Sequence, residues 1–182
     1  MLGQTSNEPE AIRAQVRDII AAEVTDDGLR FDPETLKAEA ITEDADYQGL
    51  RVTFTGFLDK ARIPMQLDMG FGDSIFPFPS WLELPTLLDF PAARIKCYTP
   101  ESSIAEKFQA MVNLGELNSR MKDFYDIWLL SRQHEFRLEN LKGAVERTFQ
   151  KRGTKIPETN PFSAAFVDSK QSQWQWLNSS VP

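Results

Sequence analysis

The stretch from Thr99 to Leu130 constrains the fold most, because its apolar residues recur at the spacing of two consecutive amphipathic helices. In the first helix Ile104, Phe108 and Met111 share one face, and the segment that begins at Gly115 supplies the break. The apolar side of the second helix consists of Met121, Phe124, Tyr125 and Trp128. A third helical pattern follows over residues 138–149, so this half of the chain is expected to be helical.

Charged side chains crowd the first turns of the second helix, where Arg120, Lys122, Asp123 and Asp126 follow in one short run. Lys122 and Asp126 are one turn apart, and Asp123 and Asp126 are three residues apart, so all three can project into one cleft. On the first helix Lys107 lies between the apolar stripe and solvent, where its ammonium can reach a phosphate. Taken alone, each of these residues also fits an ordinary solvated helix surface.

Before these helices the chain alternates between apolar and polar residues in two runs, over residues 50–55 and 63–69. A turn signal near Asp59 separates the runs, which predicts a hairpin-like antiparallel pair of strands with one buried face. Asp68 stands on the polar side of the second run, directly before a Gly-Phe-Gly-Asp turn. A carboxylate at a strand end can bind a hard cation, although a solvated strand residue is the more ordinary interpretation.

The N-terminal segments give a weaker pattern. Residues 9–24 repeat apolar side chains at helical spacing, which predicts a helix with one buried face. Leu29 and Phe31 indicate a short strand, whereas residues 33–41 fit a helix or a strand.

The segments around the central helices are predicted from their turn-forming and helix-capping residues. Residues 70–91, rich in Gly, Pro and Phe, predict a loop with an edge strand, and a brief strand follows at residues 94–98. Ser103 and Glu106 have the spacing of a capping box. Residues 157–182 predict a docked helix with a frayed end.

Together these patterns predict an α+β chain, in which a small mixed sheet is followed by a helical half. The sheet part, with one preceding helix, covers residues 1–98, and the helical half covers residues 99–182. At 182 residues, 41% of them hydrophobic, the chain can fill a core, and we expect one compact domain.

Composition excludes several kinds of site. Cys97 is the only cysteine and His134 the only histidine, so neither an intramolecular disulfide nor a Cys/His zinc site can form. A metal would have to be held by carboxylates, which suits magnesium, manganese or calcium. No run of about 18 apolar residues and no signal pattern occurs, so we expect a cytoplasmic protein with no membrane partner.

The net charge of −7 argues against nucleic-acid binding over the whole surface. The nearest approach to a basic patch is formed by Lys151, Arg152 and Lys155. Its more ordinary interpretation is a helix C-terminus whose cations complement the helix dipole.

Two motifs in the helical half are similar to a known family. Glu101 to Met111 (E-x-x-I-A-E-K-F-Q-A-M) and Asn118 to Asp126 (N-S-R-M-K-D-F-Y-D) resemble the core of the AbiEii/AbiGii nucleotidyltransferase-like toxins. These toxins belong to abortive-infection, type IV toxin–antitoxin systems. Three upstream segments also resemble the family in the same order, namely Tyr47 to Val52, Ile63 to Asp73 and Tyr98 to Glu101.

The resemblance implies a DNA-polymerase-β-like nucleotidyltransferase fold, in which carboxylates at strand ends bind magnesium and a nucleoside triphosphate (NTP). It also implies transfer of a nucleotide to an acceptor such as tRNA. By resemblance Asp68 is a catalytic carboxylate and metal ligand, Lys107 contacts phosphates, and Asp126 completes the catalytic set. Beside the nucleotide the family places an R-x-K-D-x-x-D motif, which here contributes Arg120, Lys122 and Asp123 as nucleotide-binding residues.

One departure concerns the family's first motif, a Gly-Gly or Gly-Ser helix start followed by an Asp-x-Asp pair on a strand. We expect this motif to be missing, because Asp26-Asp27 before Gly28 is a turn signal. In relatives the pair would fall just before Met1, so we expect either an internal Met taken as the start or a truly shortened relative. Without these carboxylates we expect little or no transferase activity, and Mg²⁺ binding only where they are present.

Another class of function is also open, a non-catalytic binding or scaffold protein that keeps the fold and pairs with an antitoxin or a second copy. Missing first strands would leave a sheet edge exposed, which favours strand addition or a homo-oligomer. Nucleotide binding through Lys107 and Lys122 without a metal is a third interpretation.

Overall fold

The computed structural model describes residues 8–42, 48–115, 118, 120–162, 164 and 166. The chain divides into two units, Leu2–Gly72 and Asp73–Pro182. Both units combine helix and sheet, which confirms the α+β prediction. Where one small mixed sheet was predicted, the described strands form a three-stranded and a two-stranded sheet, and all of their pairings are antiparallel.

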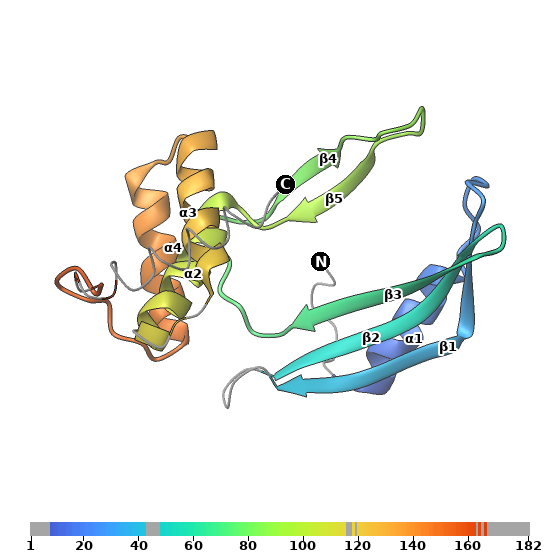
Figure 1. Cartoon of the computed structure of the whole chain (residues 1–182), viewed down its shortest axis with the longest axis horizontal. Coiled ribbons are helices and arrows are strands. Elements are labelled where there is room, and N and C mark those ends of the chain that lie inside the picture. Colours follow the sequence, from blue (N-terminus) through green and yellow to red (C-terminus); the bar gives the residue numbers. More distant parts are fainter. Residues whose placement is uncertain are drawn as a thin grey trace. The chain divides into compact units, whose positions relative to one another are not determined.

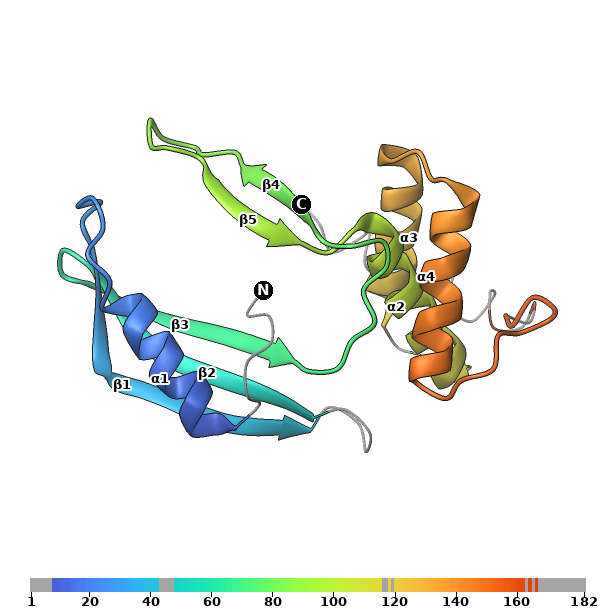
Figure 2. The ribbon, with the colours of Figure 1, turned by 180° about the vertical axis from the view of Figure 1, so that it is seen from behind.

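In the N-terminal unit, helix α1 (Pro9–Ile20) packs on a sheet of β1 (Leu29–Thr42), β2 (Gln48–Leu58) and β3 (Ala61–Gly70). The strand order is β1-β2-β3 (Figure 1), and Figure 2 shows α1 lying across one face of the sheet. The predicted helix and hairpin are therefore confirmed. The core between helix and sheet consists of Ile12, Val16, Leu36, Leu50, Val52 and Phe54.

The segment that fitted a helix or a strand, residues 33–41, belongs to strand β1. The register between β1 and β2 shifts between Asp32 and Lys37, so this part of β1 contains an irregularity of the β-bulge kind. Thr35 holds it, because its Oγ1 donates to the Asp32 carbonyl at 2.7 Å and accepts from the Thr55 N–H at 2.9 Å. The shift interrupts the two-residue alternation, which explains why the pattern indicated neither element clearly.

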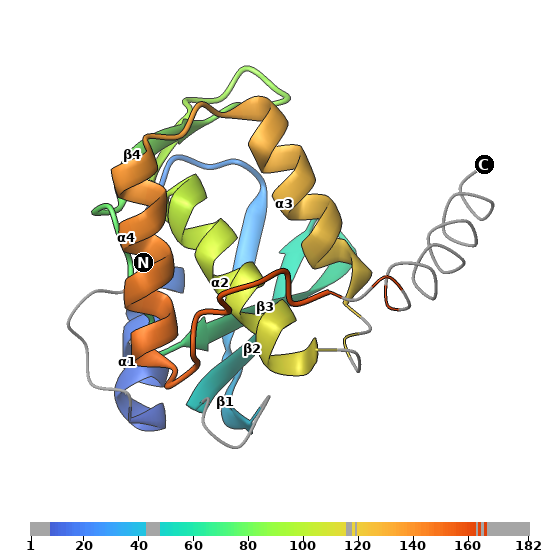
Figure 3. The same cartoon turned by 90° about the vertical axis from the view of Figure 1, so that its left-hand side faces the viewer.

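The C-terminal unit begins with a hairpin of β4 (Ser80–Leu84) and β5 (Ala93–Cys97), which extends away from the helices of this unit (Figure 1). The helices are α2 (Pro100–Leu114), α3 (Met121–Gln133) and α4 (Leu138–Lys151). Helix α2 packs against both others and lies between them (Figure 3). Buried apolar side chains of this unit include Ile104, Ala105, Met111, Met121, Ala144 and Phe149.

The start of α2 differs from the prediction. The N-cap is Thr99, whose side-chain oxygen accepts a hydrogen bond from the Ser102 N–H at 3.3 Å. Pro100 at the first helical position favours this start, so Ser103 and Glu106 lie inside the helix. The predicted capping box is therefore wrong, because the Thr-Pro pair begins the helix earlier.

Only part of the C-terminal tail lies among the described residues. Phe162 and Phe166 pack on Phe124 of α3, with ring centroids 5.4 and 5.7 Å away. The predicted docked helix falls largely on residues 167–182, which lie outside the described part of the chain. No helix of the described segments is long and apolar enough to cross a membrane.

Candidate functional site

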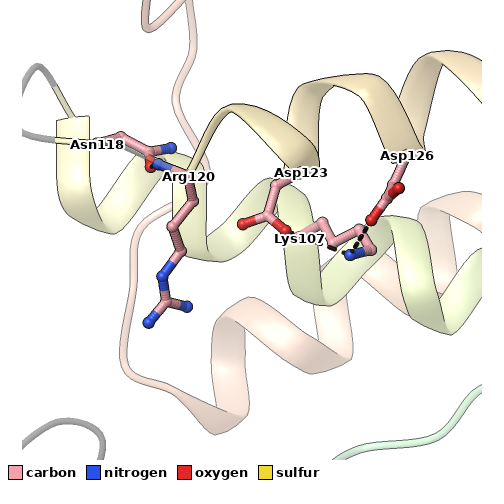
Figure 4. A network of polar contacts seen from close by, with 5 residues as sticks. All are labelled: Lys107, Asn118, Arg120, Asp123 and Asp126. Carbon is pink, nitrogen blue, oxygen red and sulfur yellow. Dashed lines mark hydrogen bonds and ion pairs between the residues drawn. The ribbon is translucent and has the colours of Figure 1, made fainter. Parts of the chain in front are cut away.

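Helices α2 and α3 bring one lysine and two aspartates together. The Lys107 ammonium donates hydrogen bonds to Asp126 Oδ2 at 2.7 Å and to Asp123 Oδ1 at 3.2 Å (Figure 4). Asp123 and Asp126 lie three residues apart on α3, so both carboxylates can face α2. These three residues are called the Lys107 cluster below.

The Lys107 cluster is partly withdrawn from water and carries unequal charge. The exposed fraction is 27% for the Lys107 side chain, 8% for Asp123 and 37% for Asp126. Partial burial pulls the pKa of Lys107 down, but the hydrogen bonds to Asp126 and Asp123 outweigh burial and hold this pKa above its ordinary value. The lysine therefore stays charged, and two carboxylates with one ammonium leave a net negative charge.

The start of α3 is fixed by Asn118, which is fully buried. Its side-chain oxygen accepts a hydrogen bond from the Arg120 N–H at 2.8 Å (Figure 4). Its side-chain nitrogen is buried with no hydrogen-bond partner among the residues described here. Asn118 was not among the predicted site residues, although it opens the N-S-R-M-K-D-F-Y-D motif. Its contact with the Arg120 N–H helps to set where α3 begins.

The two cations of the R-x-K-D-x-x-D motif, Arg120 and Lys122, do not join the Lys107 cluster. Arg120 and Lys122 are both exposed, whereas the adjacent Asp123 is buried. Neighbouring residues of a helix do not face the same way, so a buried Asp123 turns Lys122 outward. Of the three side chains predicted to share one cleft, the structure brings Asp123 and Asp126 together, and the cation between them is Lys107.

Asp68 lies in the N-terminal unit, on β3, directly opposite Arg51 on β2. Its Oδ1 accepts from Arg51 Nε at 2.7 Å, and its Oδ2 accepts from Arg51 Nη2 at 2.9 Å and from Gln66 Nε2 at 3.0 Å. The hydrogen bond from Arg51 lowers the pKa of Asp68 most, desolvation opposes it, and the hydrogen bond from Gln66 adds to the lowering. Both carboxylate oxygens are thus already engaged.

The family resemblance implies a magnesium ion, for which carboxylates would be the ligands. Within the described segments no three His, Cys, Asp or Glu side chains come together as a group that could hold a metal ion. The oxygens of Asp68 are held by Arg51 and Gln66, and one oxygen each of Asp123 and Asp126 accepts a hydrogen bond from Lys107. The described residues therefore do not fit a magnesium site.

A second polar group, not foreseen from the sequence, joins the segment before β4 to α2 and the end of α4. Arg152 donates to Asp73 Oδ1 at 3.3 Å and to Gln109 Oε1 at 3.0 Å, and the Tyr98 hydroxyl donates to Asp73 Oδ2 at 3.2 Å. Lys151 ends α4 and Arg152 is its C-cap, so the interpretation of the basic trio as a helix end is confirmed for these two residues.

Glu106 borders both polar groups. Burial, and after it the negative charge of Asp73, raise the pKa of Glu106 to about 7 against the opposing cations Arg152 and Lys107. Its buried Oε1 has no hydrogen-bond partner in the described part of the chain. In the sequence Glu106 is marked only by its position next to Lys107, and this position does not predict that its carboxyl is buried.

Contrary to the expectation that an Asp-x-Asp pair is missing, the sequence contains one such tripeptide, Asp44-Ala45-Asp46. It lies between β1 and β2 and outside the described residues.

Comparison with known proteins gives a match that spans nearly the whole chain. A family model described as Nucleotidyl transferase AbiEii toxin, Type IV TA system, matches residues 1–180. No curated protein and no solved structure matches the sequence. The family resemblance that the motifs indicated is therefore confirmed.

Proposed function

The chain belongs to the AbiEii nucleotidyltransferase toxin family of type IV toxin–antitoxin systems, and on this premise we propose that its C-terminal unit binds an NTP at the Lys107 cluster. The observation that carries the proposal is the pairing of Lys107 with Asp126 at 2.7 Å and with Asp123 at 3.2 Å. A nucleotidyltransferase fold, and transfer of the nucleotide to an acceptor such as tRNA in the cytoplasm, are parts of the same proposal.

Each member of the cluster has a distinct part in the proposal. An ammonium group has three donors, so two carboxylates leave Lys107 one N–H for a phosphate oxygen. Asp123, at 8% exposure, is the fixed counter-charge that holds the ammonium in place. Asp126 is more exposed, at 37%, and its carboxylate accepts a hydrogen bond from a hydroxyl of the nucleotide or the acceptor. Arg120 and Lys122, both exposed, supply further positive charge beside the nucleotide.

Transfer itself needs more than the described residues supply. Nucleotidyl transfer is driven mainly by positioning and by cations that neutralise charge on the phosphates. Asp68 is paired with Arg51, and no described residues form a metal site. We therefore propose that the 182-residue chain binds and orients nucleotide but transfers it poorly by itself.

The test is direct binding of each NTP to the purified chain by equilibrium dialysis, with Lys107→Ala compared with wild type. Loss of one charge-assisted contact predicts roughly 10-fold weaker binding. A matched control is Lys142→Ala, because Lys142 forms an exposed pair with Glu146 at 3.7 Å and lies on α4, outside the cluster. Wild-type protein that binds no NTP, or equal effects of the two substitutions, would sink the proposal.

Transfer is measured separately, by incorporation of labelled nucleotide into tRNA in the presence of magnesium. The expected result is little or no incorporation by the wild-type chain. Robust incorporation would overturn the inactivity part of the proposal and leave the binding part standing.

A second candidate function is favoured by exposed apolar side chains on and beside the β4–β5 hairpin. Phe78 is 91% exposed, Trp81 60% and Leu87 102%, which suits a surface that a partner covers. Family membership implies an antitoxin partner, and a second copy of the chain is the other option. Light scattering of the purified chain tests the second copy, and a monomer at all concentrations would count against it.

A further inference from the structure

The hairpin of β4 and β5 has two faces of opposite character. Successive residues of a strand point to opposite faces, and residues opposite each other on paired strands share a face. By the register of the two strands, the pair Ser80 and Cys97 begins one face, which continues with only apolar residues: Leu82, Leu84, Ala93 and Ile95. These four apolar residues are called the hairpin face.

Every charged residue of β4 and β5 lies on the opposite side of the hairpin, namely Glu83, Arg94 and Lys96. Trp81 shares that side, because the Arg94 guanidinium carbon lies 5.7 Å from the centroid of its ring. One side of the hairpin is thus suited to water, and the hairpin face is suited to a core.

The hairpin face has little cover from the described helices of its own unit. Leu82 is 50% exposed, Leu84 45% and Ile95 37%. Neither strand packs extensively on α2, α3 or α4, and the strands pack mainly on each other. A two-stranded hairpin alone is marginally stable in water and needs a further layer over its apolar side. We therefore expect a partner to cover the hairpin face.

More apolar side chains beside the hairpin face enlarge the surface that a partner can cover. Four of them lie before β4 or in the segment that joins the strands, namely Phe78, Leu87, Leu88 and Phe90. With the three large residues of the hairpin face, they are exposed by 37% to 102%. A standard interface buries about 800 Å² on each partner, and seven large apolar side chains at this exposure offer a surface of that order.

The chemistry of the hairpin face fits a second copy of the chain. In a dimer with two-fold symmetry one patch meets itself, so a patch with an excess of one charge repels itself. The hairpin face has no charged residue, whereas the opposite side of β4 and β5 has two cations for one carboxylate. Charges and hydrogen-bonding groups let an interface select a different protein, and here they point away from the hairpin face.

We propose that two copies of the chain associate by packing their hairpin faces against each other, an inference that rests on the second candidate function and not on the Lys107 cluster. Two antiparallel sheets pack about 10 Å apart with their apolar side chains interdigitated. Face-to-face packing buries Leu82, Leu84 and Ile95 of both copies and leaves the charged side in water. Pairing at the strand edges would leave the hairpin face exposed.

The experiment is sedimentation equilibrium of the full chain over a wide range of concentrations. The wild-type chain is expected to change from monomer to dimer as the concentration rises. Leu82→Glu is expected to weaken the dimer at least about 100-fold, because it buries like charges in both copies. Leu82→Ala adds no charge and is expected to weaken the dimer about 10-fold or more, because each copy loses a buried leucine side chain.

Trp81 provides a matched control on the same strand. It directly precedes Leu82, is 60% exposed and lies on the charged side of the hairpin, opposite Lys96. Trp81→Glu adds the same charge as Leu82→Glu, so it is expected to leave the dimer close to that of wild type. Thermal unfolding of each variant checks that the fold persists.

A wild-type chain that stays monomeric at all concentrations would overturn the proposal, and so would equal effects of Leu82→Glu and Trp81→Glu. A dimer that survives both Leu82 substitutions would show that the copies meet elsewhere. NTP binding is a separate measurement, so the dimer can fail while the Lys107 cluster stands. A wild-type chain that dimerises but binds no NTP would leave this inference standing and remove the proposed nucleotide site.

Discussion

Each of the two units holds an ion pair built on a predicted site aspartate, but the surroundings of the two pairs differ. In the N-terminal unit Arg51 and Asp68 meet across neighbouring strands, with side chains 39% and 44% exposed. In the C-terminal unit one partly buried Lys107 serves two carboxylates, of which Asp123 is only 8% exposed. The Arg51–Asp68 pair has one cation for one carboxylate and is exposed to solvent. The Lys107 cluster has one cation for two carboxylates and is partly buried.

This difference distinguishes an ion pair with an ordinary structural role in a sheet from a charged group that is typical of a functional site. A cross-strand pair in solvent contributes little energy and fits the register of β2 and β3. Placing two carboxylates on one lysine away from water costs desolvation energy that stability alone does not repay. Such an arrangement is typical of functional sites, which is why the proposed function rests on Lys107 and not on Asp68.

The largest effect is expected from Lys107→Met, which removes the cation and leaves Asp123 buried without its partner. We expect the free energy of unfolding to fall by about 2–3 kcal/mol, because an uncompensated buried charge is costly. Urea unfolding measures this change. Lys142→Met is the control, since its pair with Glu146 is exposed on both sides. Similar losses for the two variants would erase the distinction between the two kinds of pair.

The second-largest effect is expected at Glu106, which borders the Lys107 cluster, and it concerns the pH dependence of the free energy of unfolding. Burial raises its pKa from 4.5 to about 7, so the folded state binds the proton more tightly than the unfolded state. Stability from this group is therefore complete below about pH 4.5 and is lost as the pH rises through about 7. Glu106→Gln should remove this dependence and be more stable than wild type at about pH 8, by about 1–2 kcal/mol.

The measurement for Glu106 is the difference in unfolding free energy between wild type and Glu106→Gln from about pH 5 to about pH 8. Glu139→Gln, on the exposed first turn of α4, serves as the control. Parallel curves for wild type and Glu106→Gln would show that the carboxyl is not buried as described.

Periodicity predicted the helices and the β2–β3 hairpin well, because each of these elements buries one face, whereas the residues of β4 and β5 are almost all exposed. The hairpin of β2 and β3 followed from strict alternation, and helices α1 to α4 followed from their apolar stripes. The bulge in β1 could not be predicted, since the shift between Asp32 and Lys37 breaks the alternation on which the prediction depends. The start of α2 was misplaced because two sets of capping residues compete and Pro100 decides between them.

The candidate site could be predicted only as a set of residues. The resemblance singled out Lys107 and Asp126, but their contact joins positions nineteen residues apart on two helices. Sequence spacing relates residues within a helix and says nothing of how two helices pack, so Lys122 was grouped with the aspartates in place of Lys107. The contact of Arg152 with Asp73 spans seventy-nine residues, and no local pattern could indicate it.

The smallest effect is expected at the exposed pair. The hydrogen bond from Arg51 lowers the pKa of Asp68 below 3.8, so the pair contributes above that pH and loses its contribution as the pH falls further. Because both side chains are exposed, Asp68→Asn at neutral pH should leave the urea midpoint close to that of wild type. Arg51→Gln should behave alike, since each variant removes the same pair. A loss of stability as large as that of Lys107→Met would mean that Asp68 contributes more to the fold than an exposed cross-strand pair does. The two units would then not differ in the way described.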